Sequence, residues 1–307
     1  MKDNNFKRKL LHSFQKNWQL YVFMLPAILY ILFFAYKPMY GILIAFEDFS
    51  IRKGIMGSEW VGFEHFERLF SSYWFPITLK NTLVLSFLNL FMGFPIAIIL
   101  ALFFNEVRNA RYRKMVQTVS YAPHFISTVV MCSIIFLMLD PRTGVVNKVL
   151  NVLGMESVNF MNRPELFKWV YSLTNIWQGV GWSSIIYFAA LSSLDKSLLE
   201  AAEIDGASRI QRIWYINIPT IIPTIMVTFI LQCGQVLSIG YEKILLLQTD
   251  VNITASEVIS SYVYKVGLEQ ADYSFSTAAG LFNTVVNCVF LIAANKISKK
   301  VTDSGLF

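Results

Sequence analysis

Residues that carry chemistry are scarce in this sequence. Its 307 residues include only three histidines, which have no metal-ligand spacing. The three cysteines all lie in apolar stretches, where no disulfide framework is expected: they are Cys132, Cys233 and Cys288. No glycine-rich phosphate loop, nucleophile elbow or pair of catalytic carboxylates occurs. We therefore predict a non-enzyme with no catalytic residues, no metal site and no cofactor of its own.

Charge is also scarce. Charged residues make up 15% of the chain and hydrophobic residues 55%, and the mean hydropathy is +0.50. A soluble domain of this length carries more charge. Apolar runs of about 18 or more residues recur, which is typical of membrane-spanning helices. The composition therefore argues against a large soluble protein with buried helices.

Six apolar segments are each long enough to cross a hydrocarbon core about 30 Å thick as a helix. They cover residues 20–46, 78–104, 116–139, 169–191, 220–239 and 277–294. The predicted fold is an all-α integral membrane protein with six transmembrane helices. Prolines inside these segments can kink a helix without ending the span: they are Pro26, Pro95, Pro123 and Pro223.

Basic residues concentrate in the N-terminal segment, in the loops after the second and fourth segments, and in the C-terminal tail. They are Lys2, Lys7, Arg8, Lys9, Lys16, Arg108, Arg111, Arg113, Lys114, Lys196, Arg209, Arg212, Lys296, Lys299 and Lys300. Since cytoplasmic loops are rich in lysine and arginine, both termini are predicted to be cytoplasmic. The expected domains are a cytoplasmic segment 1–18, a transmembrane domain 19–296 and a cytoplasmic tail 297–307. The first span has no cleavage site and is expected to be an uncleaved anchor. The net charge of +6 then reflects topology, and no nucleic-acid partner is predicted.

A charged insert, EAAEIDGASRIQRIWYINIP, separates the fourth and fifth segments. Asp195 or Ser197 can cap a short helix, Gly206 allows the chain to turn, and a second short helix leads to Pro219, which opens the next span. The apolar face of the first helix suits a groove of another protein. The pattern equally fits an amphipathic linker on the membrane surface, so residues 195–218 are left with both interpretations.

The spacing of this insert resembles the signature of permease subunits of binding-protein-dependent ABC importers, which have a MetI-like fold. The matching residues are Glu200, Ala201, Ala202, Gly206, Ile216, Ile218 and Pro219. Ile218 stands where the family usually has leucine. The stretches YAPHFISTVV, LDPRTGVVNKVLNVLG and NIWQGVGWSSIIYFAAL resemble LplB-type permeases of complex oligosaccharide importers, in the carbohydrate-uptake branch.

The resemblance implies a bacterial plasma-membrane importer that moves sugars, in particular complex oligosaccharides, by alternating access. It implies four kinds of partner: a second homologous permease, two ATPase subunits that bind ATP, an extracellular sugar-binding protein or lipoprotein, and the oligosaccharide itself, in a lipid membrane. It also implies that the insert is a coupling helix that docks on an ATPase. The implied coupling residues are Glu200, Ala201, Ala202, Asp205, Gly206, Ile216 and Pro219.

Polar residues within the spans are candidates for a substrate path, because they are costly in lipid unless they face protein or water. The candidates are Trp177, Gln178, Gln232, Gln235, Asn283 and Asn287, and Trp182 and Tyr187 are further aromatic residues that could stack on sugar rings. Asparagine and glutamine also join helices to one another, and tryptophan also anchors helix ends at the interface. Helix packing is the stronger expectation for any single one of these residues.

Two other function classes remain open from the residues alone. A stand-alone secondary transporter or channel commonly uses intramembrane carboxylates or histidines, and here only His124 qualifies. Such transporters also contain inverted repeats, and we detect no repeat in this sequence. An integral membrane enzyme would need a catalytic cluster, which the sequence does not offer. Copurification of an ATPase with this chain would discriminate among the three classes.

Overall fold

The structure is a computed structural model that describes residues 16–302, 305 and 306. The chain is almost entirely helical, in agreement with the predicted all-α class. Its one described sheet is a hairpin of β1 (Glu47–Asp48) and β2 (Glu59–Trp60), paired antiparallel. The basic residues Lys2, Lys7, Arg8 and Lys9, which contribute to the predicted orientation, lie outside the described residues.

Four helical segments of the described chain are long and apolar enough to cross a membrane: Trp18–Phe46, Trp74–Glu106, Arg209–Cys233 and Tyr273–Lys300. A fifth is obtained if the pair Ala110–Phe125 and Thr128–Leu139 is one span, although the two helices are bent by 102°. The four segments correspond to the first, second, fifth and sixth predicted spans, and the bent pair corresponds to the third.

Three of these segments contain a π-helical turn that ends two residues before a proline. The elements of the three segments are α2 (Trp18–Ile31), η1 (Leu32–Tyr36), α3 (Lys37–Met39) and η2 (Tyr40–Phe46); α5 (Trp74–Leu88), η4 (Asn89–Gly93) and α6 (Phe94–Glu106); and α12 (Arg209–Arg212), η6 (Ile213–Asn217) and α13 (Ile218–Cys233). The prolines are Pro38, Pro95 and Pro219. A proline has no N–H for the carbonyl four residues earlier and clashes with it. The wider π turn accommodates that clash, so the helix continues without a sharp break.

The third predicted span is broken. It consists of α7 (Ala110–Tyr121), η5 (Ala122–Phe125) and α8 (Thr128–Leu139). Pro123 lies in η5, and the Ser127 hydroxyl caps α8 by accepting a hydrogen bond from the Val130 N–H. Pro123 therefore sits beside a sharp bend, whereas the other three predicted prolines lie within continuous helices.

The fourth predicted span lies in α10 (Pro164–Ser192), which has 29 residues. At 1.5 Å per residue this helix is about 43 Å long, but it is not among the segments apolar enough to be recognised as spans. Its middle contains Asn175, Gln178, Ser183 and Ser184, which lower its hydropathy. Asn175, Gln178 and Ser183 line a cavity between the helices, and Ser184 is buried.

The fifth predicted span ends earlier than expected, because α13 stops at Cys233, residues 234–237 form turns and residues 238–240 have no regular secondary structure. Four short helices follow: α14 (Tyr241–Leu247), α15 (Ile253–Ser256), α16 (Ile259–Tyr264) and η7 (Lys265–Glu269). The last helix, α17 (Tyr273–Thr302), has 30 residues and continues without interruption past residue 296, where the tail was expected to begin. The remaining connections contain η3 (Ile55–Gly57), α4 (Glu64–Ser71), α9 (Val145–Val152) and α11 (Lys196–Ile204).

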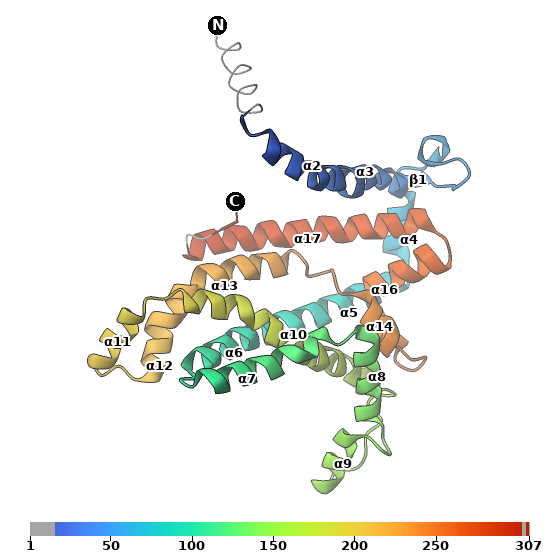
Figure 1. Cartoon of the computed structure of the whole chain (residues 1–307). Helices are drawn as coiled ribbons and strands as arrows, with labels where there is room; N and C mark the ends of the chain where they lie inside the picture. The colour runs from blue at the N-terminus through green and yellow to red at the C-terminus, as the bar shows by residue number, and fades with distance from the viewer. Residues whose placement is uncertain (1–15, 303–304, 307) are drawn as a thin grey trace.

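The helices pack around α10. It contacts α6, α7 and α13, and α13 in turn packs on α17. One buried cluster joins α6, α10 and α13 through Ala101, Tyr187 and Ile221, and the Tyr187 hydroxyl hydrogen-bonds to the Thr228 hydroxyl at 2.9 Å. Figure 1 shows α11, α12, the α6–α7 connection and the C-terminal end of α17 at one end of the bundle, with β1, α4 and α16 at the other.

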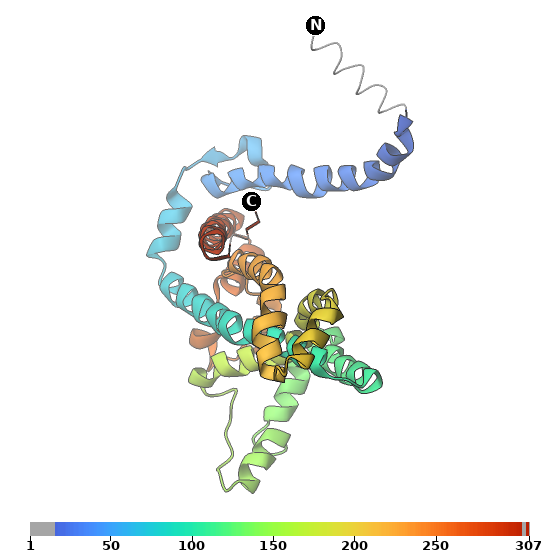
Figure 2. The same cartoon turned by 90° about the vertical axis from the view of Figure 1, so that its left-hand side faces the viewer.

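The N-terminal helix stands apart from the bundle. η2 packs on α17, but α2 extends away from the other helices (Figure 2). None of the residues of α2, all of which the structure describes, is buried. An apolar helix of this kind needs lipid or another protein around it.

Candidate functional site

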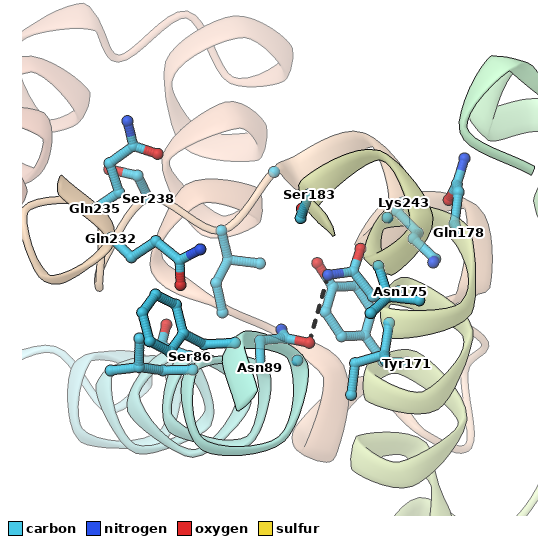
Figure 3. A pocket seen from close by; sticks show the side chains of 18 of the residues that line it. Ser86, Asn89, Tyr171, Asn175, Gln178, Ser183, Gln232, Gln235, Ser238 and Lys243 are labelled. Carbon is cyan, nitrogen blue, oxygen red and sulfur yellow. Dashed lines mark hydrogen bonds between the residues drawn. The ribbon is translucent and has the colours of Figure 1, made fainter. Parts of the chain in front are cut away.

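A cavity of about 470 Å³ lies between the α5–α6 segment, α10, the end of α13 and α14 (Figure 3). Much of its lining is polar. The polar and charged residues that line it are Ser86, Asn89, Thr128, Tyr171, Asn175, Gln178, Ser183, Gln232, Gln235, Ser238, Glu242 and Lys243. Amides and hydroxyls of this kind both donate and accept hydrogen bonds, so the cavity suits a ligand that is rich in hydroxyl groups.

Three residues of α10 face this cavity from one side of the helix. Tyr171, Asn175 and Gln178 recur at intervals of four and three residues, which places them on one helical face. Asn175 donates to the Asn89 side-chain oxygen at 3.4 Å, and Gln178 donates to the Ile126 carbonyl at 3.2 Å. Gln178 therefore also ties α10 to the bend between η5 and α8.

Two glutamines, Gln232 in the last turn of α13 and Gln235 just after it, have side-chain amides that are free to bind a ligand. Gln232 and Gln235 are both exposed and line the cavity. In the part of the chain that the structure describes, their side-chain amides make no hydrogen bond within the chain. Each amide can therefore bind a ligand without first giving up an internal partner.

Three of the six residues predicted for the path line the cavity, namely Gln178, Gln232 and Gln235. Asn283 and Asn287 do not; both bind the non-helical segment that follows α13. The Asn287 oxygen accepts from the Leu237 N–H at 2.9 Å and its nitrogen donates to the Ser238 hydroxyl at 2.9 Å. Asn283 donates to the Leu237 carbonyl at 3.4 Å. These amides satisfy backbone groups that the end of the helix leaves free.

The predicted aromatic residues are not part of the lining. Trp177 is 46% exposed and lies outside it. Trp182 stacks on the His124 ring at a centroid distance of 4.6 Å. Tyr187 is buried in the α6–α10–α13 cluster. The aromatic residues that do line the cavity are Phe94 and Tyr171.

The sequence analysis did not identify Lys243, the cation in the cavity lining. Lys243 lies on α14, outside the spanning helices, and is only 6% exposed. Its ammonium has no hydrogen-bond partner among the described atoms and lies 5.5 Å from the centroid of the Tyr171 ring. Burial lowers the pKa of this ammonium to about 8. No sequence pattern distinguishes it from a solvated lysine in a connecting segment.

A second surface is formed by α11 and the turn that follows it. The Asp195 carboxylate caps α11 by accepting a hydrogen bond from the Ser197 N–H at 2.9 Å, as predicted, and this bond lowers the pKa of Asp195. Gly206 has a φ of +78°, and Ala207 N–H donates to the Ala202 carbonyl at 2.9 Å. This Schellman turn requires the left-handed conformation that glycine adopts without strain.

The charged residues of α11 differ in their pairing. One carboxylate oxygen of Glu203 lies 3.2 Å from a guanidinium nitrogen of Arg108, and the other lies 3.1 Å from a guanidinium nitrogen of Arg212. Glu203 therefore links α11 to the α6–α7 connection and to α12. Glu200 is exposed and, within residues 16–302, makes no ion pair. The Ile204 side chain, at the end of the helix, is 86% exposed. Glu200 and Ile204 are four residues apart, so both are exposed on one face of α11.

The other predicted coupling residues are divided between this surface and the next helix. Ala201 and Asp205 are exposed on α11 and its C-cap, and Ala202 is half-buried. Ile216 is half-buried in η6, and Pro219 is exposed at the start of α13. α12, η6 and α13 run on continuously, so one helical segment joins the turn at Gly206 to Gln232.

Residues 81–303 match the family described as the binding-protein-dependent transport system inner membrane component. The chain belongs to this family. The membership predicted from the insert is thereby confirmed, and the matched range of the permease contains the cavity and the α11–α12 surface.

Curated relatives and solved structures cover nearly the whole permease. It is 44% identical over 301 residues to the polygalacturonan/rhamnogalacturonan transport system permease protein YteP of Bacillus subtilis, covering 98% of this chain and 94% of the relative. It is 42% identical over 288 residues to protein LplB of the same organism, covering 94% and 91%. A chain of a bacterial alginate ABC transporter, solved in complex with an alginate pentasaccharide-bound periplasmic protein, has a TM-score of 0.88 and 42% identity over 97% of this chain and 100% of that chain.

Proposed function

We propose that this permease is a subunit of an ATP-driven ABC importer that carries oligosaccharides across the bacterial plasma membrane by alternating access. The observation that carries the proposal is the cavity lined by amides and hydroxyls between α10 and the end of α13. Sugars present many hydroxyl groups, which such a lining can bind. The names of its relatives agree, because they describe transport of polygalacturonan, rhamnogalacturonan and alginate.

The proposed topology has six passes: α2–η2, α5–α6, the bent α7–α8 pair, α10, α12–α13 and α17. α10 is included although it is more polar, because its polar residues face the cavity and not lipid. The arrangement in Figure 1 supports this count, since the α6–α7 connection, α11, α12 and the end of α17 lie at one end of the bundle. The basic residues of that end support a cytoplasmic location for both termini.

The proposed substrate path follows the cavity. We assign sugar contacts to Gln178, Gln232 and Gln235, together with Asn89 and Asn175, which the sequence analysis did not single out. We assign Asn283 and Asn287 the role of holding residues 237 and 238 in place. Trp177, exposed outside the cavity, is assigned to the lipid interface or to a neighbouring subunit.

The proposed coupling helix is α11, which would dock in a groove of an ATPase subunit. Glu200, Ala201, Ala202 and Asp205 would contact the ATPase, with Ile204 as an apolar anchor. Gly206 would set the turn, and Ile216 and Pro219 would pass its movement to α13. The ATPases would bind ATP and supply the energy.

The further proposed partners are a second homologous permease and an extracellular sugar-binding protein or lipoprotein. The exposed faces of α2 leave room for the second permease as well as for lipid. A binding-protein partner is supported by the alginate transporter, which was solved together with its periplasmic protein.

The function is tested by affinity purification of this permease from its own bacterium and by reconstitution of the recovered complex. We expect two further kinds of subunit, an ATPase and a second permease, to copurify. In proteoliposomes, uptake of a labelled oligogalacturonate should require ATP and the binding protein. Uptake that proceeds without ATP, or purification of the chain alone in an active form, would favour the stand-alone transporter.

The path assignment predicts different outcomes for two amides. Gln235→Leu should lower uptake by about ten-fold in a complex that assembles normally, because it removes only a ligand-binding amide. Asn287→Leu should instead lower the melting temperature, because the buried Leu237 N–H loses its acceptor, at a cost of about 1–3 kcal/mol. Uptake per assembled complex and thermal melting in detergent separate the two effects. Normal uptake by assembled Gln235→Leu would remove this residue from the path.

A further inference from the structure

The cavity lining contains a buried cation that pairs with no carboxylate of the described residues. The Lys243 side chain lies in the lining beside Tyr171, Asn175 and Gln178 (Figure 3). It is 6% exposed, and its ammonium has neither a hydrogen bond nor an ion pair within the described residues. The described chain contains another partly buried lysine, Lys265, which pairs with Glu257. Lys243 differs from Lys265 because its ammonium has no such partner among the described residues.

Such an arrangement is costly for the fold. An ammonium removed from water needs hydrogen-bond acceptors and an opposite charge. The face of the Tyr171 ring, 5.5 Å away, offers a weak attraction but no acceptor. An isolated buried cation is better explained by a ligand that completes it than by stability of the fold.

The carboxylate next to Lys243 in the sequence does not pair with it. Glu242 precedes Lys243 on α14, is exposed and also lines the cavity. It forms none of the ion pairs of the described residues, so its carboxylate is more than 4 Å from the ammonium. Glu242 therefore leaves Lys243 unpaired and adds a negative charge to the same lining, so its removal should favour an anionic ligand.

We propose that Lys243 binds a carboxylate of the transported sugar, so that the permease selects oligosaccharides that contain uronic acid residues. A carboxylate carries one negative charge, which one ammonium neutralises, and its remaining lone pairs can accept from the amides of Asn175 and Gln178 on the adjacent face of α10. Neutral hydroxyls of the same sugar would bind Gln232 and Gln235. This inference rests on the proposed function and adds the charge of the substrate to it.

The test compares trigalacturonate with its methyl ester, which keeps the sugar backbone and replaces each carboxylate with a neutral ester, in the reconstituted complex with its binding protein and ATPases. Lys243→Met retains the length of the side chain and removes its charge, Lys243→Arg retains the charge, and Glu242→Gln removes the neighbouring negative charge. The same binding protein serves every variant, so its own preference cancels when each variant is compared with the wild-type permease on one substrate.

We expect Lys243→Met to lower trigalacturonate uptake by about ten-fold or more and to change uptake of the ester by less than about two-fold. Lys243→Arg should restore most of the acid uptake, and Glu242→Gln should raise it, because it removes a repulsive charge from the lining. Equal losses for acid and ester would overturn the proposal and assign Lys243 a structural role. If the wild-type complex took up the ester but not the acid, the proposed selection of charged sugars would be wrong, whereas the proposed import of oligosaccharides would stand. If the wild-type complex transported neither of these two substrates, and also failed to transport sulfated and neutral oligosaccharides, the proposed function itself would be wrong.

Discussion

Gly181→Ala is expected to destabilise the permease strongly. A Cβ at position 181 of α10 would lie 1.9 Å from the Ser120 carbonyl oxygen of α7 and 2.5 Å from its carbon. Both atoms belong to backbone, which cannot rotate away, so the two helices would have to separate. Small residues permit this kind of close approach in membrane proteins, and overpacking of a fixed contact costs about 1–3 kcal/mol or more. We expect a melting temperature at least about 5 °C lower, with reduced recovery of the folded chain.

Gly179→Ala is the matched control. Gly179 lies two residues earlier on the same helix, and a Cβ there would meet nothing within 4 Å. The chemical change is identical, and alanine favours a helix over glycine by about 1 kcal/mol. The melting temperature of this variant should therefore equal or exceed that of the wild type. If both variants melted at the same temperature, the close contact between α7 and α10 would not exist in the membrane.

The second large effect is expected at the α11 surface. Glu200→Lys should reduce uptake by about ten-fold or more, because an unpaired carboxylate that meets a cation of the ATPase would become a repulsive charge. Gly206→Val should have a comparable effect, because a β-branched residue is strained at a φ of +78° and would open the Schellman turn. Both positions lie outside the spanning helices, so the membrane domain should remain folded.

Uptake, ATPase recovery in detergent pull-downs and melting temperature should be measured together. Gly206→Asn is the control for the turn, since asparagine tolerates the left-handed conformation, and should retain most of the activity. Glu156→Lys repeats the charge reversal at an exposed residue elsewhere on the chain and should leave ATPase recovery unchanged. Wild-type uptake with full ATPase recovery in both Glu200→Lys and Gly206→Val would contradict the docking role and favour a surface linker.

Local sequence patterns were sufficient for four of the spans and for the local structure of the charged insert. Apolar length alone predicts the segments that become α2–η2, α5–α6, α13 and α17, since a helix must satisfy its own backbone in lipid. The cap at Asp195 and the turn at Gly206 were also predictable, because each depends on atoms within a few residues. The bend of 102° between η5 and α8 was not. Proline permits a bend, but its size depends on what the two helices pack against.

The sequence by itself determined that this chain is a helical membrane protein of the permease family with a structured insert between its fourth and fifth apolar segments. Only the tertiary structure decided which polar residues share a cavity. Gln235 and Asn287 look alike as amides in apolar helices, yet one lines the cavity and the other binds Leu237. Gly179 and Gly181 are equally indistinguishable, and Lys243 looks like any lysine in a loop. Contacts between distant segments decide these roles, because burial and hydrogen-bond satisfaction are properties of the packed helices and not of the local sequence.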